Sequence, residues 1–190
     1  MTSDRQQLVL DGEPMEIRAH NCFACGTLNV HGLRLDLHLE HGRAWTELEL
    51  DRRFEGWEGI AHGGIVATIL DEVMAWALVA SDAWGMTARM AVEFRAPIVV
   101  GTRIRAEGEL VEARRRIFRT AARLTDASGA VLAAADGTYV AAPPERRREL
   151  QERYGFVRLP RTDASPAAPV EQTRGPDRRP NREPVSVEHG

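Results

Sequence analysis

The longest apolar stretch of the chain runs from Gly63 to Ala80, and only Asp71 and Glu72 interrupt it with charge. Its hydrophobic residues leave almost no polar face, which is typical of a helix that protein surrounds on most sides. A bilayer span needs ~20 apolar residues, and two central acids make this stretch a poor candidate for one. We therefore predict a buried helix that begins at His62-Gly63-Gly64, and we expect no membrane partner.

On both sides of the predicted helix, hydrophobic and polar residues alternate with the period of a half-buried strand. Two such segments precede the helix and four follow it: residues 33–39, 46–50, 89–95, 103–112, 117–125 and 131–141. Short turns connect the last four segments as in a meander. This order predicts an α+β domain in which an antiparallel sheet of about six strands packs on one long central helix.

One helix cannot cover six strands, so a sheet edge and the apolar residues beside the helix are left without a neighbour. A second copy of the chain is the simplest partner for these surfaces. We therefore expect a homodimer or a homotetramer.

The two ends of the chain differ in character from this central region. Residues 1–20 are expected to form an N-terminal arm, residues 21–142 the domain, and residues 143–190 a short charged helix followed by an Arg/Pro-rich tail. The tail has too few apolar residues to offset the entropy of folding, so we predict that it is disordered.

Composition narrows the partners and the compartment. The 190 residues include 25 basic and 28 acidic side chains, and the net charge of -3 argues against a nucleic-acid partner. Two cysteines cannot form a secreted disulfide scaffold, and the polar N-terminal residues lack the apolar stretch of a signal peptide. We expect a cytoplasmic protein.

The start of the predicted helix is the first candidate for chemistry. Gly63 and Gly64 leave backbone N–H groups bare in the first turn, where the helix dipole favours a developing oxyanion. Asp71 lies further along the same helix, and a carboxylate in apolar surroundings is a candidate base or nucleophile. Glu72 lies about 100° round the helix from Asp71, so only one of the two acids can point squarely into a given cleft.

A purely structural explanation of the same residues stays open. Asp71 could be hydrogen-bonded to a neighbouring strand, or paired with an arginine such as Arg89 or Arg95. Gly63 and Gly64 could simply allow the helix to pack closely on the sheet.

Several strings of residues resemble one family. They are His62-Gly63-Gly64 followed by Asp71-Glu72, the preceding Gly-Trp-Glu-Gly, the N-terminal Cys22-Phe-Ala-Cys25-Gly-x-x-Asn29, and Arg95-Ala-Pro97. Together they resemble the hotdog-fold acyl-CoA thioesterases, above all the phenylacetic-acid-degradation type and its bacterial relatives, over residues 21–142. The resemblance implies a sheet wrapped round one helix, with active sites at the interface of a dimer or tetramer.

The resemblance also implies a role for each matching residue. The Gly63 N–H would polarise the thioester carbonyl, Asp71 would act as base or nucleophile, and His62 and Gly64 would complete the turn that presents them. A hydroxyl on the strand after the helix often assists, and Thr87 stands at that position.

Two further positions near the helix bear on the resemblance. Thr68 offers a second hydroxyl, on the helix itself. Some relatives carry Asn or Gln about six residues before the histidine, where this chain has Gly56. That departure puts the efficiency of hydrolysis in question.

Other residues are candidates for binding the substrate. Arg115 and Arg116 belong to an arginine-rich turn that suits the phosphates of coenzyme A, although a solvated turn explains them as well. Trp57, Trp76 and Trp84 flank the helix and could line an acyl pocket, and core packing explains them equally well.

Cys22 and Cys25 form a lone Cys-x-x-Cys, with His20 and His31 nearby. The cysteine spacing suits zinc, yet a second ligand pair of comparable quality is missing. A redox pair is a second alternative. We interpret both cysteines as small buried residues in a turn beside Gly26, and we expect no metal and no cofactor.

The leading hypothesis for function is hydrolysis of an acyl-CoA or acyl-carrier thioester. A non-catalytic acyl-CoA-binding protein is the first alternative, because the Asn or Gln position is lost. A hotdog hydratase or dehydratase that uses His62 is the second, and a structural or redox role of the cysteines is the third.

Overall fold

The apolar stretch forms helix α1, Gly63–Ala80, in the computed structural model of the chain, which describes residues 5–159. The start and end match the prediction. Its buried residues are Val66, Ile69, Leu70, Val73, Met74, Trp76, Ala77 and Leu78. By length and composition α1 could cross a membrane, a criterion that the core helix of a globular domain also meets. In this fold α1 packs against six strands, β3, β4 and β7 to β10.

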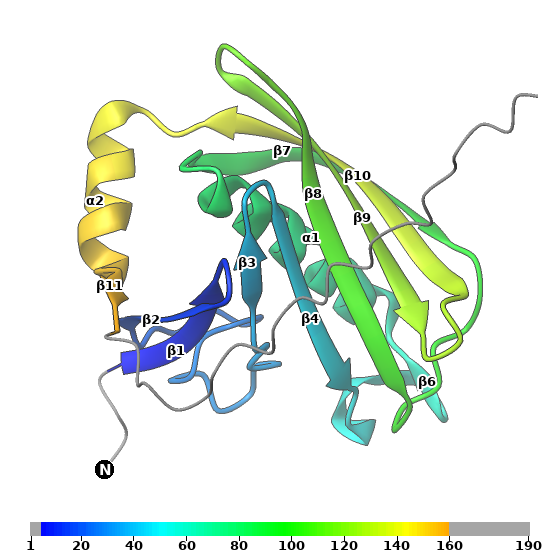
Figure 1. The fold of residues 1–190 in the computed structure, drawn as a ribbon. Helices are drawn as coiled ribbons and strands as arrows, with labels where there is room; N and C mark the ends of the chain where they lie inside the picture. The colour runs from blue at the N-terminus through cyan, green and yellow to red at the C-terminus, as the bar shows by residue number, and fades with distance from the viewer. Residues whose placement is uncertain (1–4, 160–190) are drawn as a thin grey trace, which may run out of the picture.

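A nine-stranded sheet curves around α1, as Figure 1 shows. Its order is β11-β2-β1-β3-β4-β8-β9-β10-β7, and all neighbours are antiparallel except β1 and β3. The strands are β1 (Arg5–Leu10), β2 (Glu13–Arg18), β3 (His38–Glu40), β4 (Arg43–Glu49), β7 (Gly85–Phe94), β8 (Arg103–Arg114), β9 (Ile117–Asp126), β10 (Val131–Ala141) and β11 (Val157–Arg158). The predicted α+β architecture is confirmed.

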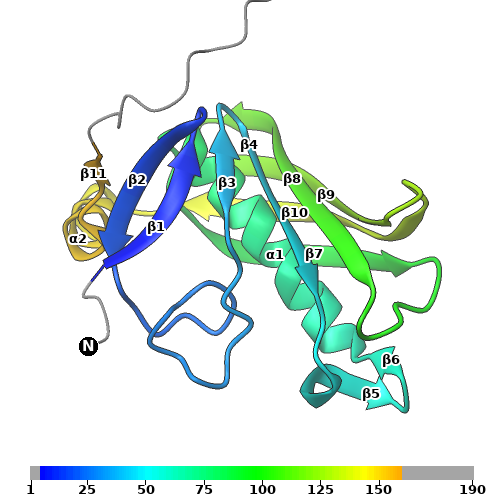
Figure 2. The ribbon, with the colours of Figure 1, turned by 60° about the horizontal axis from the view of Figure 1, so that its bottom comes forward.

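The predicted number of strands was too low. β1 and β2 form a hairpin that joins the sheet through β3, and β11 adds a further edge strand beside β2. A second, two-stranded sheet of β5 (Glu55–Trp57) and β6 (Ile60–Ala61) follows the short 3-10 helix Arg52–Phe54. Figure 2 shows this hairpin at the beginning of α1, so it belongs to the surroundings of Gly63.

The strand predicted for residues 33–39 is mostly wrong, because only β3 at its end joins the sheet. The backbone N–H groups of Leu33 and Leu35 donate instead to Phe23 and Ala24 in the cysteine-containing loop. The alternation of leucines therefore reflects packing against that loop. Every second side chain in residues 35–39 is still buried, although most of the segment is not a strand.

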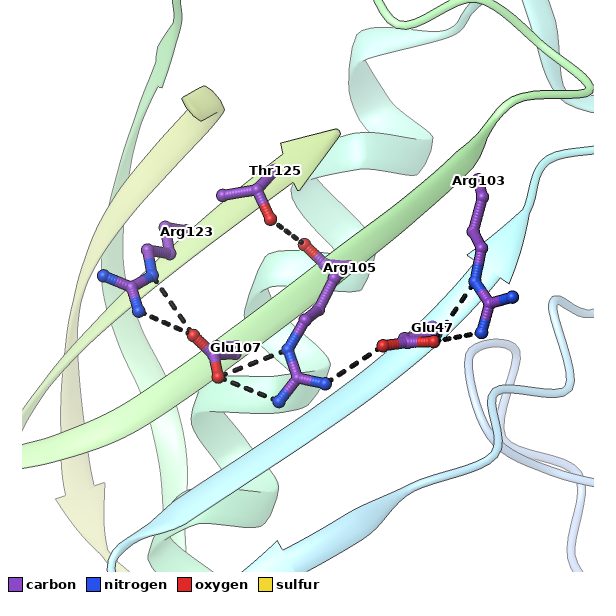
Figure 3. Close-up of polar contacts among 6 residues, drawn as sticks. All are labelled: Glu47, Arg103, Arg105, Glu107, Arg123 and Thr125. Carbon is purple, nitrogen blue, oxygen red and sulfur yellow. Dashed lines mark hydrogen bonds and ion pairs between the residues drawn. The ribbon is translucent and has the colours of Figure 1, made fainter. Parts of the chain in front are cut away.

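The outer face of the sheet carries a network of ion pairs, shown in Figure 3. Arg105 lies between Glu47 at 3.2 Å and Glu107 at 3.0 Å, while Arg103 pairs with Glu47 and Arg123 with Glu107. The inner face of the same strands carries small and apolar residues that touch α1. A shift of one residue in register would bury these charges, so the network and the core fix the same register.

Helix α2, Pro144–Tyr154, covers the segment where a short charged helix was expected. Its last residue, Tyr154, packs with Phe156 against Trp76 and Trp84, at ring-centroid distances of 5.9–6.3 Å. These contacts attach the C-terminal segment to the far end of α1. The predicted disordered tail, like residues 1–4, lies outside the described residues.

Candidate active site

The N-terminus of α1 presents one unused backbone donor. His62 caps the helix, because its Nδ1 accepts a hydrogen bond of 2.9 Å from the Gly64 N–H. The Gly63 N–H donates to no acceptor within residues 5–159. Both glycines are exposed, so Gly63 can donate to a ligand at the positive end of the helix dipole.

An apolar hollow of about 340 Å³ opens beside this donor. It is lined by Ile60, Ala61, Gly63, Val66 and residues 94–98. The Phe94 ring lies against Gly63, so close that a Cβ added to the glycine would be 3.4 Å from the ring. A thioester carbonyl bound at the Gly63 N–H would therefore have apolar surface next to it.

Gly56 explains how the preceding hairpin approaches the helix start. A Cβ at this position would lie 3.0 Å from the Cα of His62 and 3.2 Å from its ring. A side chain at this position, where some relatives carry Asn or Gln, would require His62 to move by a few tenths of an ångström.

Asp71 is held by two hydroxyl groups from the sheet. Its Oδ1 accepts hydrogen bonds from Tyr139 on β10 at 2.7 Å and from Thr87 on β7 at 2.9 Å. The Tyr139 hydroxyl also lies 3.1 Å from the Asp71 backbone oxygen. Burial, followed by the negative charge of Asp71, raises the pKa of Tyr139, so the phenol stays protonated as a donor.

This arrangement differs from the structural explanation that pairs Asp71 with an arginine. Neither Arg89 nor Arg95 contacts Asp71, and Arg95 pairs with Glu93. Two neutral donors orient the carboxylate and leave its charge uncompensated, which suits a base.

Gly63 and Asp71 are too far apart along α1 to act on one carbonyl group. Eight residues of helix correspond to a rise of about 12 Å. Both lie on the less buried side of the helix, together with Gly64 and Thr68. Within one chain they therefore line one face but do not meet.

Glu72 points to a different part of the molecule. Its Oε1 accepts a hydrogen bond of 2.8 Å from the Trp76 indole, and both of its oxygens lie 3.8 Å from the Cys22 sulfur. Burial raises the pKa of Glu72 to about 7. The two adjacent acids thus face separate groups of partners, as their 100° separation requires.

The other predicted residues do not gather around Gly63 or Asp71. The Thr68 hydroxyl donates to the Gly64 carbonyl of its own helix at 2.8 Å. Trp57 is 83% exposed on β5. Arg115 and Arg116 lie in the β8–β9 turn, where the Arg116 carbonyl accepts a hydrogen bond from the Ala141 N–H at the end of β10. Within one chain, these arginines are remote from the helix start.

The cysteines lie in a tight turn on the Glu72 side of α1. Cys25 is 1% exposed and Cys22 is half-buried. A hydrogen bond from Cys25 lowers the pKa of Cys22 to about 5, and the same bond, with burial, raises the pKa of Cys25. His20 adds a contact of 3.9 Å between its Nε2 and the Cys25 sulfur, and burial lowers the pKa of this histidine.

Tyr139 is the site residue that sequence reasoning missed. It is fully buried and occupies an inward position in the alternating pattern of β10, so it is indistinguishable from a core residue in the sequence. The roles assigned to Gly63, Asp71, Thr87 and His62 stay predictions, although their geometry is compatible with them.

The family comparison covers the region that contains His62, Gly63, Asp71 and Thr87. Residues 58–133 match the model of the thioesterase superfamily. A search of curated protein sequences finds no match.

Solved structures resemble the fold over more than half of the chain. A thioesterase superfamily protein aligns with 25% identity and a TM-score of 0.60, over 63% of this chain and 60% of its own length. A Streptococcus mutans protein bound to acetyl-CoA has 18% identity and a TM-score of 0.55, over 57% of this chain and 88% of its own length. The E. coli PaaI protein from the phenylacetic acid degradation operon has 14% identity and a TM-score of 0.52, over 54% of this chain and 75% of its own length. Residues 58–133 are thus similar to the thioesterase superfamily, and the domain built around α1 has the hotdog fold.

Proposed function

We propose that this protein hydrolyses acyl-CoA thioesters to a free acid and coenzyme A. The observation that carries the proposal is the unused Gly63 N–H beside an apolar hollow, on the same helix face as a carboxylate oriented by two hydroxyls. The acetyl-CoA bound to the Streptococcus mutans relative supports the choice of thiol carrier.

The reaction needs only these groups, because a thiolate is a good leaving group. Asp71 takes a proton from a water molecule, and the resulting hydroxide attacks the thioester carbon. The carbonyl oxygen becomes negative and accepts a hydrogen bond from the Gly63 N–H, which lies at the helix N-terminus. The C–S bond then breaks, and the departing thiolate recovers the proton from Asp71.

We infer from the rise of about 12 Å between Gly63 and Asp71 that one site uses residues of two protomers. Strand β7 supports this arrangement, because it is an edge strand of the large sheet and its residues Met86 and Phe94 are 58% and 56% exposed. Thr87, which holds Asp71, and Phe94, which covers Gly63, are on this strand. A two-fold axis that crosses β7 between them would bring Asp71 of one protomer toward Gly63 of its partner.

Release of free thiol from a panel of short-chain, long-chain and aromatic acyl-CoA thioesters tests the activity. We expect turnover by the wild type and a loss of about 10²–10⁴-fold in Asp71→Asn. If Asp71→Asn keeps the wild-type rate while Glu72→Gln loses it, the wrong carboxylate has been chosen. Equal rates in both variants and the wild type would make both acids structural.

Mixed dimers test whether the site is shared. Gly63→Pro removes the N–H donor and Asp71→Asn removes the base, so each homodimer should be impaired at both of its sites. In an equimolar mixture half of the dimers are mixed, and each has one site with both groups intact, so about a quarter of the wild-type rate should return. If no activity returns on subunit exchange, the site lies within one chain.

Gly56 favours one alternative, a protein that binds acyl-CoA without cleaving it. The chain keeps the Gly63 donor, which could hold a thioester carbonyl. It has glycine at position 56, where some relatives carry Asn or Gln. Saturable acyl-CoA binding without thiol release from any member of the panel would support it over hydrolysis.

A further inference from the structure

A second cluster of chemically reactive groups lies on the side of α1 away from the Asp71 hydroxyl partners. It consists of Cys22, Cys25 and Glu72, whose ligand atoms all lie within 4.8 Å of one another. Glu72 comes from α1, 50 residues after Cys22, so the sequence did not reveal it as a partner of the cysteines. We propose that this Cys2Glu cluster binds one Zn²⁺ ion.

The spacing of the atoms fits zinc. Tetrahedral Zn²⁺ with sulfur at about 2.3 Å and oxygen at about 2.1 Å places two ligand atoms about 3.6–3.8 Å apart. The Cys22 sulfur lies 3.8 Å from each oxygen of Glu72. Small side-chain rotations would therefore close three protein ligands around one ion.

The backbone of the turn holds Cys22 and Cys25 close together. The Gly26 N–H donates to the Cys22 carbonyl at 3.0 Å and closes the turn. Only glycine fits at position 26, because a Cβ there would lie 2.3–2.6 Å from backbone atoms of His20 and Cys22.

The cluster lacks a protein cation. Glu72 accepts its hydrogen bond from the Trp76 indole, and no arginine in residues 5–159 forms an ion pair with it. Two thiolates and a carboxylate packed together would need protons or a cation to offset their negative charges. A divalent ion supplies this charge, and zinc is the one that prefers two thiolates with a carboxylate.

His20 supports the cluster from outside the ligand set. Its Nδ1 accepts a hydrogen bond of 3.3 Å from the Cys22 N–H, which leaves the ring proton on Nε2. That Nε2 lies 3.9 Å from the Cys25 sulfur and donates to it. Because Cys22 is half-buried, a water molecule can take the fourth position on the metal.

The position of the cluster gives the ion a structural role. The ligands join the turn at residues 22–25 to the middle of α1, and Tyr154 of α2 packs on His20 and Trp76 at 4.9 and 6.0 Å. Zinc at this place would tie the turn directly to α1, beside the contact with α2.

Cobalt and zinc binding to the reduced full-length protein tests the proposal. We expect about one equivalent of zinc per chain, and on Co²⁺ addition a sulfur-to-cobalt charge-transfer band with the visible bands of a tetrahedral site, which Zn²⁺ then abolishes. Cys25→Ser should abolish the bands, Glu72→Gln should weaken Co²⁺ binding, and His20→Ala should weaken it by about 10–100-fold. His31→Ala is the matched control, since His31 is exposed and lies outside the cluster.

Two results would overturn the zinc site. One is a wild-type protein with two titratable thiols that binds less than a tenth of an equivalent of zinc and gives no charge-transfer band with Co²⁺. The other is Co²⁺ binding that is unchanged in both Cys25→Ser and Glu72→Gln, because the ion would then lie outside this cluster. Neither readout depends on thioester hydrolysis, so failure of the proposed activity leaves the zinc test intact.

Discussion

Replacement of Gly63 by proline removes one atom group from the proposed site, the N–H that polarises the carbonyl. Gly63 is the first residue of α1, the helical position where proline is best tolerated because its missing N–H has no helical partner. His62 has φ -65° and ψ 132°, the extended conformation that a residue before proline prefers. The substitution therefore removes the donor without removing a hydrogen bond of the fold.

The expected effect follows from the strength of a single oxyanion donor. Loss of such a donor lowers kcat by about 10²–10³-fold, or about 2.7–4 kcal/mol of transition-state stabilisation. Gly63→Ala is the matched control, because it keeps the N–H and adds a Cβ only 3.4 Å from the Phe94 ring, an ordinary contact at its lower limit. We expect its kcat to stay within about threefold of the wild type.

The assay is steady-state thiol release with the best substrate, alongside thermal unfolding of all three proteins. Equal midpoints of unfolding would show that the helix start is intact. If Gly63→Pro then keeps the same kcat as Gly63→Ala, the Gly63 N–H does not stabilise the transition state, and the oxyanion role is refuted.

Three further predictions concern groups that surround the site. Tyr139→Phe should lower the free energy of unfolding by about 1–3 kcal/mol and kcat about tenfold with little change in KM, because Asp71 loses its 2.7 Å donor; urea unfolding and kinetics measure both, and an unchanged kcat would deny Tyr139 a positioning role. Gly108→Ala should destabilise the fold by about 3 kcal/mol, since its Cβ would lie 2.5 Å from backbone atoms of Val73 in α1; a loss below about 0.5 kcal/mol in denaturant would contradict this packing. Chelation of the proposed zinc should lower the midpoint of thermal unfolding by about 5–10 °C relative to protein with zinc at 100 times its Kd; an identical midpoint with and without chelator would count against a structural ion.

The sequence predicted the elements whose buried residues follow a single pattern, either a continuous apolar helix or a strand with alternating apolar and polar residues. α1 was bounded correctly because nearly every residue in it is apolar, and β8, β9 and β10 were found because their alternating residues face α1. β1 and β2 were missed because Gln6 occupies a buried position and Pro14 lies within a strand. The Gln6 amide is satisfied by Cys25 at 2.7 Å and by Thr27 at 3.3 Å, and no local pattern reveals those partners.

The sequence predicted those residues of the candidate site that lie on α1 or on the strand that follows it. Gly63 and Asp71 share α1, and Thr87 was placed as the hydroxyl residue on the strand after that helix. Tyr139 could not be found in this way, because its contact with Asp71 spans 68 residues and depends on the register of β10. A bulge between Thr138 and Tyr139 shifts that register at the point of contact.

The two adjacent acids of α1 show why residue identity alone could not assign their roles. Consecutive helical positions are about 100° apart, so Asp71 reaches the hydroxyls of β7 and β10 while Glu72 reaches the cysteine turn. Both are carboxylates in an apolar stretch, and only their partners distinguish a base held by neutral donors from a metal ligand beside two thiols. The same separation means that Asp71→Asn and Glu72→Gln perturb different proposed sites. Zinc content should therefore follow position 72 and not position 71, which separates metal binding from hydrolysis even though the two residues are bonded neighbours.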